Sequence, residues 1–268
     1  IIYGQEIDTT EYKPGIEKSY SVGDVVYYNP NKNVIDCTNY TESKSLNENK
    51  TGCMKWYVIN DKGSTMDVLL DHNTTSKVAW YDGNTTQSSS SKNDLIASPM
   101  LVSGDNTKGP LTANAQLASD VSSWTGQAKS TARMITFEEL KAMLPSYSSL
   151  SEEEFINNYF DDLQTAAQQA QANINQSDYS TTKAYYLALI NYLKNNSSVL
   201  LPSYMFEDIL PICSDDVDCP TNGYWTSSLH DGKSSRAWYV NLGGNLDRHG
   251  FDDADRFGLR PVITISKS

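Results

Sequence analysis

The sequence has little positive charge and no long hydrophobic run. It holds 21 Lys and Arg against 33 Asp and Glu, which gives a formal charge of −12 at pH 7. Nucleic acids and anionic membrane surfaces are bound through cationic faces, so this balance argues against both partners. No apolar segment reaches the roughly 18 to 20 residues that a bilayer span needs. We therefore expect no nucleic-acid partner and no direct insertion into a membrane.

Histidines and catalytic motifs are also scarce. The three His residues, His72, His230 and His249, are too few for a His-based metal cluster. The sequence lacks a phosphate loop, a dinucleotide fingerprint, a Gly-x-Ser-x-Gly elbow and a His-Glu-x-x-His motif. Ser180-Thr-Thr-Lys183 and Lys50-Thr-Gly52 match two penicillin-binding signatures, but in reversed chain order, and patterns this short recur by chance. Carboxylate pairs for glycoside hydrolysis stay open, because their separation of about 5 to 9.5 Å depends on the fold. We predict no enzymatic activity.

Only four cysteines occur, as two local pairs, Cys37 with Cys53 and Cys213 with Cys219. The spacing of the second pair does not suit a zinc knuckle, and no nearby His completes a ligand set. We therefore predict two disulfides, the first closing a polar loop and worth about 3 kcal/mol. Disulfides indicate an oxidising compartment, so we expect a secreted or cell-surface protein. Because the chain starts at Ile1, we expect a processed ectodomain whose signal or anchor lies outside this sequence.

The composition supports a packed domain after a short lead-in. Hydrophobic residues make up 38% of the chain and aromatic residues 10%, enough for one sizeable core or two small ones. Residues 1–19 have few apolar anchors and are expected to be an extended lead-in to one domain at 20–268. Strand-like runs bounded by turn residues predict a β-meander with one covered face. Its strands are expected at Gly23–Tyr28, Met54–Asn60 and Thr65–Leu70, with a further short strand at Lys77–Tyr81.

Helical signals follow in the middle of the chain. Thr136 with Glu139 and Ser151 with Glu154 have the spacing of capping boxes, which open helices. Four helices are expected here, at Leu111–Trp124, Phe137–Leu144, Glu152–Asn173 and Thr181–Lys194, and a further short helix is expected near Tyr204–Ile209. In the first, the apolar face is predicted to consist of Leu111, Ala115, Ala118 and Val121.

The last two of these four helices are predicted to form an inserted hairpin at about 146–198. Their apolar residues are expected to face one another, with Phe155, Tyr159, Phe160 and Leu163 on the first helix. The polar outer face, rich in Gln and Asn, carries no recognisable chemistry. We therefore interpret the hairpin as a packing element.

Strands return near the carboxyl terminus, at Gly223–Ser228, Arg236–Leu242 and Leu259–Ile265. Alternation in the second strand puts Trp238, Val240 and Leu242 on one face and Ala237, Tyr239 and Asn241 on the other. One face is expected to pack and the other to meet water or a ligand. The framework residues Trp225 and Trp238 are expected in the core. Arg260 lies inside an apolar strand, so we expect it to be paired with a carboxylate.

These strands carry a resemblance. The order Gly223-Tyr-Trp-Thr-Ser-Ser228, Ala237-Trp-Tyr-Val-Asn241, Gly243-Gly244 and Gly258-Leu-Arg-Pro-Val-Ile-Thr-Ile265 resembles the carboxyl-terminal part of C-type-lectin-like domains in bacterial surface proteins. That family includes a formylglycine-generating-enzyme-like branch and the variable proteins of diversity-generating retroelements. The resemblance covers roughly the final 45 residues, and the helical hairpin has no counterpart.

The resemblance implies a fold and a binding surface. The fold is α+β and C-type-lectin-like, with small twisted antiparallel sheets, paired amino- and carboxyl-terminal strands, and here an inserted α-helical hairpin. Ligands would meet the loops between the last strands, at 229–235 and 245–256. The implied contact residues are His230, Asp231, Asn245, Asp247, Arg248, His249, Phe251, Asp252, Asp253, Asp255 and Arg256.

The second loop segment mixes donors, acceptors, both charge signs and Phe251 as an exposed aromatic, as an adaptable contact surface requires. All residues at 245–256 are amino acids that adenine substitution in Asn-type codons can produce. Lysine is not such an amino acid, so Lys233 would be a fixed position. The alternative is an acidic loop that merely keeps a sheet edge soluble. If the surface binds a ligand, replacing Phe251 and Arg248 by Ala should leave the melting temperature nearly unchanged.

Two chemistries of the family are not carried over. Calcium-dependent sugar binding needs a Glu-Pro-Asn or Gln-Pro-Asp tripeptide, and neither occurs; Asp252, Asp253 and Asp255 could supply oxygens to Ca²⁺ but lack an EF-hand pattern. The formylglycine-generating branch uses a carboxyl-terminal cysteine pair, whereas every Cys here precedes Trp225. We therefore expect no cofactor.

The expected function is non-catalytic binding of a protein or peptide partner with basic groups. A structural or assembly module of a bacterial adhesin or pilus is the alternative, with pairing of residues 1–19 to a neighbouring subunit as its signature. A degraded enzyme of the formylglycine-generating branch is a third hypothesis.

Overall fold

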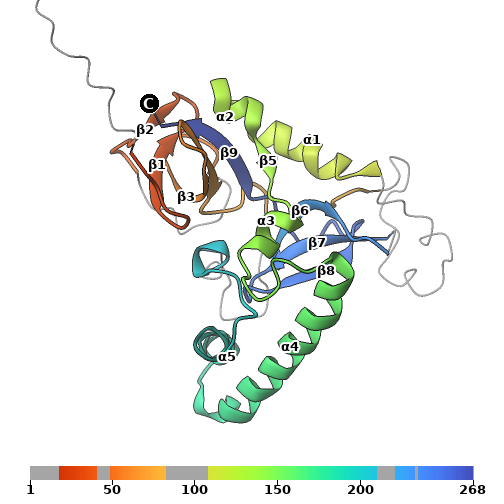
Figure 1. The fold of residues 1–268 in the computed structure, drawn as a ribbon. Coiled ribbons are helices and arrows are strands. Elements are labelled where there is room, and N and C mark those ends of the chain that lie inside the picture. Colours follow the sequence, from red (N-terminus) through yellow and green to blue (C-terminus); the bar gives the residue numbers. More distant parts are fainter. Residues whose placement is uncertain (1–17, 41–48, 83–107, 210–220, 233–234, 268) are drawn as a thin grey trace, which may run out of the picture.

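The computed structural model describes residues 18–40, 49–82, 108–209, 221–232 and 235–267. They form an α+β fold with two antiparallel sheets and a helical hairpin (Figure 1). Most of the predicted lead-in, and the pair Cys213 and Cys219, lie outside these residues. The predicted disulfide between Cys37 and Cys53 is present, with Cα atoms 5.9 Å apart. Within the described part of the chain, no helix combines the length and the apolar character needed to cross a membrane.

The larger sheet has six strands, and every neighbouring pair is antiparallel. In spatial order the strands are β2 (Val34–Ile35), β1 (Val25–Asn29), β3 (Met54–Asp61), β4 (Thr65–Leu70), β9 (Pro261–Ser266) and β5 (Arg133–Met134). The predicted meander of β1, β3 and β4 is confirmed. The first and last long strands share the sheet, but β3 and β4 separate them, so the expected direct pairing of the amino- and carboxyl-terminal strands is wrong.

The larger sheet is covered unevenly. Strand β1 alternates exposed and buried residues as far as Tyr28, as expected for a sheet with one covered face. Strands β3 and β4 are instead buried on both sides, with Val68 in one hydrophobic core and Leu69 in another. The segment Lys77–Tyr81 forms no strand, and its Trp80 is fully buried. The prediction of one covered face therefore holds at β1 and is wrong in the middle of the sheet.

The smaller sheet has three strands, β6 (Gly223–Leu229), β7 (Arg236–Asn241) and β8 (Leu246–Gly250). Trp238 and Val240 on one face of β7 belong to the core shared with the helices, whereas Ala237 and Tyr239 on the other face belong to the core of the larger sheet. The prediction that one face of this strand meets water or a ligand is therefore wrong. Because both faces are packed, β7 is held firmly between two cores.

The helices in chain order are α1 (Leu111–Asp120), α2 (Gly126–Thr131), α3 (Phe137–Ala142), α4 (Glu152–Asn173) and α5 (Thr182–Asn196). Both predicted capping boxes are present, at the starts of α3 and α4. The buried face of α1 consists of Ala113, Leu117 and Asp120. Of the predicted apolar stripe, Val121 is buried just past the end of the helix, whereas Leu111, Ala115 and Ala118 are exposed. Hydrogen bonds explain why Asp120 lies on the buried face. Its carboxylate accepts hydrogen bonds from Lys50, Thr74, Thr75 and Gln116 at 2.6 to 2.8 Å.

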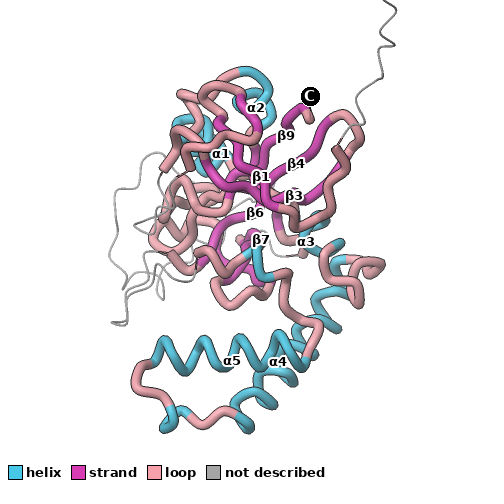
Figure 2. The backbone as a smooth tube through the Cα atoms, turned by 90° about the vertical axis from the view of Figure 1, so that its left-hand side faces the viewer, coloured by secondary structure: helices cyan, strands magenta, loops and turns pink. Residues whose placement is uncertain are grey.

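The hairpin of α4 and α5 projects away from both sheets (Figures 1 and 2). The predicted facing of α4 side chains toward α5 is wrong for Phe155, Tyr159 and Phe160, whose rings contact the smaller sheet. Phe155 packs edge-on to Trp238 at 5.9 Å, and the Tyr159 hydroxyl accepts the backbone N–H of Leu246 at 2.9 Å. The first turns of α4 therefore pack on the smaller sheet. Only the remaining part of α4 pairs with α5.

Arg260 is fully buried beside β9, and its partners are not the expected carboxylate. Its guanidinium donates to the backbone carbonyls of Leu70 at 2.5 Å, Met205 at 2.5 Å and Tyr204 at 2.8 Å, above the ring of Tyr224. Carbonyl dipoles satisfy the guanidinium donors in place of a negative charge. This one side chain thus joins β4, the 203–206 segment and the last strand.

Candidate ligand-binding surface

Two of the predicted loop segments meet at one end of the smaller sheet. Arg236 at the start of β7 pairs with Gly250 at the end of β8, and the Phe251 backbone N–H donates to the Ser235 carbonyl at 3.2 Å. The β6–β7 turn and the chain after β8 therefore lie side by side. We call the accessible charged and polar side chains at this end the strand-end surface, which consists of Asp231, Arg236, His249, Asp252, Asp253, Asp255 and Arg256.

Asn245 lies elsewhere. It occupies the β7–β8 turn, at the opposite end of β8, about 13 Å from His249 along the strand. Its carbonyl accepts the backbone N–H of Asn241 at 2.9 Å. The neighbouring Gly244 has a φ of +84°, and a Cβ there would overlap the Phe206 ring, so this turn is packed against the chain before β6. Asn245 is not part of the strand-end surface.

The pleat of β8 divides the remaining predicted contacts between two faces. Asp247 and His249 stand opposite Tyr239 and Ala237 on one face, whereas Arg248 stands opposite Trp238 on the other. The Arg248 guanidinium lies 4.2 Å above the Phe160 ring of α4, and partial burial lowers its pKa. Arg248 therefore anchors the hairpin and does not join the strand-end surface.

Two predicted contact residues are buried. Phe251 is 3% exposed, with its ring 6.5 Å from that of Trp80 and 5.8 Å from that of Tyr81. Its carbonyl accepts the Tyr81 backbone N–H at 3.0 Å, which fixes the backbone with the ring inward. His230 is 5% exposed and stacks on Trp238 at 5.5 Å, and burial lowers its pKa. The expectation that these side chains meet a ligand is wrong.

The strand-end surface is predominantly acidic. Asp253 lies 3.1 Å from Arg256 Nε and 3.7 Å from His249 Nε2, and its other oxygen accepts the Asp255 backbone N–H at 2.9 Å. This pairing offsets the charge of Arg256. The side chains of Asp231, Asp252 and Asp255 are exposed, and no ion pair is recorded for any of them in the described part of the chain. Three carboxylates therefore face solvent at this end of the sheet, together with the exposed cationic side chain of Arg236.

Aromatic packing supports this surface from below. The Phe257 ring lies 4.5 Å from that of Trp225 and 4.2 Å from that of Tyr239. The next residue, Gly258, leaves no room for a Cβ against the Thr75 carbonyl and the Asn73 amide. On the chain just before β6, the Asn222 backbone N–H donates to the Arg256 carbonyl at 2.5 Å. The loop backbone is therefore tied down at both ends.

Glu152 is a positioning residue that the sequence did not reveal. Its Oε1 accepts the Asp231 backbone N–H and the Trp238 indole N–H, both at 2.9 Å, and burial raises its pKa. The capping box placed Glu152 in the first turn of a helix. Nothing in the sequence indicated that this turn would lie against β7, 86 residues further along the chain.

The described residues do not bring together the side chains that a metal site or an acyl-transfer site would need. Across the described ranges, no three His, Cys, Asp or Glu side chains gather into a group that could hold a metal ion, including the calcium considered for Asp252, Asp253 and Asp255. Of the penicillin-binding matches, Lys50 is paired with Asp120 of α1 at 2.6 Å, whereas Ser180 precedes α5 at the other end of the molecule (Figure 1).

Comparison with models of known protein families, with curated proteins and with solved structures finds no match to this chain.

Proposed function

We propose that the chain is a non-catalytic binding protein of C-type-lectin-like type, secreted or displayed on a bacterial cell, whose strand-end surface binds a basic segment of a protein or peptide. The observation that carries the proposal is the convergence of two loop segments, with three exposed carboxylates, on a sheet that is packed on both faces. The Cys37–Cys53 disulfide supports an oxidising compartment.

The geometry favours binding because little has to be ordered when a partner arrives. The loop backbone is already hydrogen bonded to Ser235, Tyr81 and Asn222, so the entropic cost of fixing it is small. The exposed carboxylates attract a cationic partner over a distance set by ionic strength, about 10 Å at 0.1 M salt. Such contacts raise the association rate and select against acidic partners.

The test uses a synthetic Lys- and Arg-rich peptide and its Glu-rich counterpart, with binding followed by calorimetry. We expect the basic peptide to bind, and the Asp252→Asn/Asp255→Asn variant to bind it about tenfold more weakly, which corresponds to roughly 1.4 kcal/mol. The matched control is Asp161→Asn/Asp178→Asn, which removes the same charge from the exposed side of the hairpin. Equal weakening in both variants would show attraction to net charge alone and would overturn the proposal.

Diversification of this surface remains part of the proposal. If residues 245–256 vary between related copies, the buried Leu246 and Phe251 should stay apolar, because both belong to hydrophobic cores. A reverse-transcriptase gene beside a near-copy of the 3′ end of this gene would support diversification. Copies that differ freely at Leu246 or Phe251 would contradict it.

An assembly module is the second candidate, favoured by one observation. Val22, Val25, Tyr27 and Val34 are among the few large apolar side chains that the described residues expose, and all lie on or beside β1 and β2 at the edge of the larger sheet. Exposed apolar edges are typical of association surfaces. If assembly is the function, the chain should form oligomers by light scattering and Val25→Asp should be monomeric, whereas an unmodified chain that stays monomeric excludes this candidate.

A further inference from the structure

The β6–β7 turn contains the pair Asp231-Gly232, a sequence that can rearrange without an enzyme. In such a pair the amide nitrogen of the second residue attacks the carboxyl carbon of the first and closes a five-membered succinimide ring. Glycine favours this step, because it has no Cβ to obstruct the approach and its backbone rotates most freely. The sequence holds three Asn-Gly or Asp-Gly pairs, Asp82-Gly83, Asn222-Gly223 and Asp231-Gly232. Gly83 lies outside the described residues, so the structure bears only on the other two pairs.

The Asp231-Gly232 pair is open to this reaction. Both residues are exposed, and they lie in the turn just after β6. Gly232 has a φ of +84°, and a Cβ added there would meet no atom within 4 Å, so nothing crowds the backbone of the turn. Glu152 accepts the Asp231 backbone N–H at 2.9 Å, but this contact precedes the reacting peptide bond. No hydrogen bond from the Gly232 N–H is recorded in the described part of the chain, so this nitrogen is available for attack.

The Asn222-Gly223 pair is closed to the reaction. By sequence this pair would rank first, because a side-chain amide loses ammonia more readily than a carboxyl group loses water. Gly223 instead begins β6, is buried, and donates its backbone N–H to the Thr221 hydroxyl at 3.2 Å. A Cβ on Gly223 would overlap the Val240 carbonyl oxygen, so the neighbouring strand holds this backbone tightly. The fold therefore blocks ring closure at Asn222.

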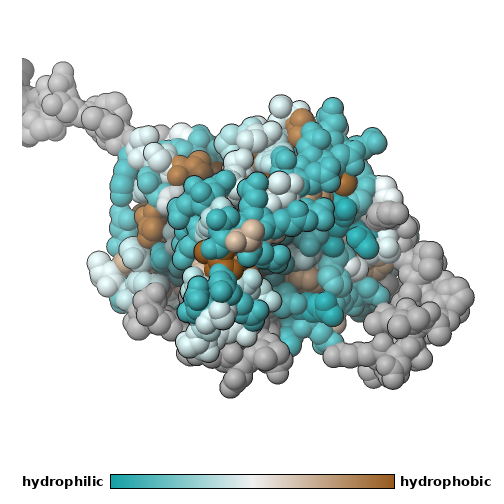
Figure 3. Space-filling view, turned by 90° about the horizontal axis from the view of Figure 1, so that it is seen from below, coloured by the Kyte–Doolittle hydropathy of each residue, from teal (hydrophilic) through white to brown (hydrophobic). Residues whose placement is uncertain are grey.

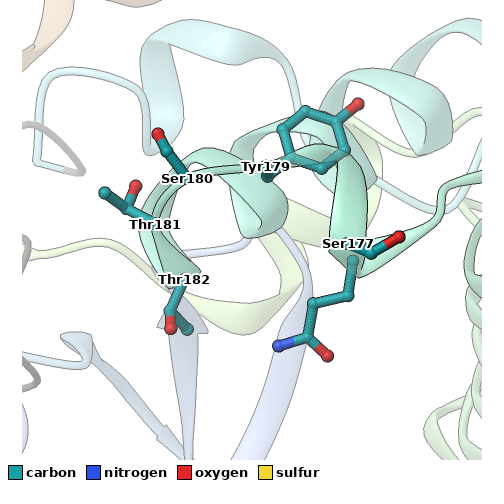
Figure 4. Close-up of a pocket in the computed structure, with 6 residues that line it drawn as sticks. Ser177, Tyr179, Ser180, Thr181 and Thr182 are labelled. Carbon is teal, nitrogen blue, oxygen red and sulfur yellow. The ribbon is translucent and has the colours of Figure 1, made fainter.

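Exposure by itself does not select Asp231. Most of the molecular face in Figure 3 is hydrophilic, and other aspartates are exposed. One of them, Asp178, ends the short 3-10 helix η4 (Gln176–Asp178) in the turn between α4 and α5. The labelled side chains of this turn point away from one another (Figure 4), and Tyr179, which follows Asp178, donates its backbone N–H to the Gln176 carbonyl at 3.2 Å. The nitrogen that would attack Asp178 is therefore hydrogen bonded, and the Tyr179 side chain stands beside it.

We propose that Asp231 converts spontaneously to isoaspartate. With the carboxyl group protonated, its carbon Cγ forms a bond to the Gly232 nitrogen, and the hydroxyl leaves as water together with the amide proton. Water then adds to the main-chain carbonyl carbon of Asp231 in the ring, and the bond from that carbon to the Gly232 nitrogen breaks. The chain afterwards runs through Cβ and Cγ of Asp231. No atom is gained or lost overall, and neither an oxidant nor a reductant takes part.

The conversion changes the strand-end surface without changing its net charge. The free carboxylate is then attached directly to Cα, one carbon closer to the backbone, and the chain path to Gly232 is longer by one methylene group. One exposed carboxylate of this surface is thus drawn back toward the contact with Glu152. The reaction requires only the exposed turn, so it does not depend on the function proposed above.

The experiment is a timed incubation of the full chain in mildly acidic buffer, where carboxyl groups are protonated more often, followed by peptide mapping. After reduction, trypsin releases residues 195–233 as one peptide that contains both pairs, because no Lys or Arg interrupts it before Lys233. We expect a second form of this peptide with unchanged mass, which endoproteinase Asp-N no longer cuts before Asp231. The fraction converted at Asp231 should exceed that at Asn222 or Asp178 by about tenfold or more.

Two further samples serve as controls. Asp231→Glu keeps the charge but would need a six-membered ring, so its peptide should stay in one form. The unmodified chain incubated in guanidinium chloride should convert at Asn222 as well, because the protection of that pair depends on β6. The proposal is overturned if Asp231 stays unconverted in the folded chain, if Asn222 converts there equally fast, or if Asp231→Glu gives the same second form.

Discussion

Phe251 shows how a single side chain limits the strand-end surface. Asp247 and His249 of β8 face the core of the larger sheet, and the same alternation carries Phe251 onto that side. The sequence places Phe251 among charged residues, which suggested exposure. The structure instead uses it to close the core above Trp80.

At the residue scale, Phe251→Ala should therefore destabilise the fold. Loss of a buried phenyl group costs about 3 to 5 kcal/mol through transfer and cavity terms. Urea unfolding should show a lower midpoint with a similar slope. The neighbouring, exposed Asp252→Ala is the control and should change stability by less than about 0.5 kcal/mol. An unchanged midpoint for Phe251→Ala would restore the sequence-based expectation of an exposed contact.

At the element scale, Asp61 ties three segments together. It ends β3, and its carboxylate accepts the Tyr20 and Gly63 backbone N–H groups and the Lys267 ammonium, the last at 2.7 Å. The hydrogen bond from Lys267 is the largest of the effects that lower the Asp61 pKa to about 2. The carboxylate thereby links the start of the domain to the residue after β9.

This pKa has a consequence for acid stability. Between pH 3.8, the ordinary pKa of Asp, and about 2, the unfolded chain binds a proton at Asp61 that the folded chain does not. The contribution of Asp61 is therefore complete above this window and is lost as the pH falls through it. Asp61→Asn should be less stable at neutral pH and should lose less stability between pH 4 and 2.

Thermal unfolding at several pH values measures this slope. The control is Asp82→Asn, which removes an exposed aspartate from a loop. It should follow the unmodified chain at every pH. A slope for Asp61→Asn that also matches the unmodified chain would show that Asp61 titrates normally in the fold.

At the scale of the whole molecule, the smaller sheet joins two hydrophobic cores. Trp225 and Tyr239 belong to the core of the larger sheet, while Tyr224 and Trp238 belong to the core that includes α3 and the start of α4. Helix α5 is different, because Leu189 is its only buried residue. Packing is therefore dense at the sheets and sparse at the end of the hairpin.

Native-state hydrogen exchange should reveal this difference. Amides of β7 should open only with global unfolding, whereas amides of α5 should open locally and exchange faster by orders of magnitude. Peptide-level mass spectrometry after brief and long labelling measures both. Equal protection of α5 and β7 would mean that the hairpin unfolds together with the sheets.

The elements that the sequence predicts best are those marked by local signals, such as capping boxes and turn residues. The capping pairs Thr136–Glu139 and Ser151–Glu154 fix helix starts through contacts three residues apart, and both are present. The meander was predicted because alternation and turn residues are equally local. Helix α2 and the two-residue strands β2 and β5 were missed, because elements this short have no periodicity of their own. Strand β8 was also missed, because its mostly polar residues were interpreted as part of a loop at 245–256.

The candidate site was predicted only in part. The sequence indicated that 229–235 and the end of 245–256 would flank one sheet, and they meet through Ser235 and Phe251. It could not show that Arg248 packs against α4 while Asp252 is exposed, because this difference depends on which face of β8 contacts α4. It could not reveal Glu152, whose role depends on a contact with β7.

By itself, the sequence determined the local structure: where most helices begin, which strands form hairpins, that Cys37 and Cys53 can be joined, and that the segment 245–256 is acidic. The tertiary structure alone decided burial: it turned Phe251 and His230 inward, gave Arg260 carbonyl partners and covered both faces of β7. Capping and turn formation depend on neighbours a few residues away. Which side of a strand is covered depends on packing between segments far apart in the chain.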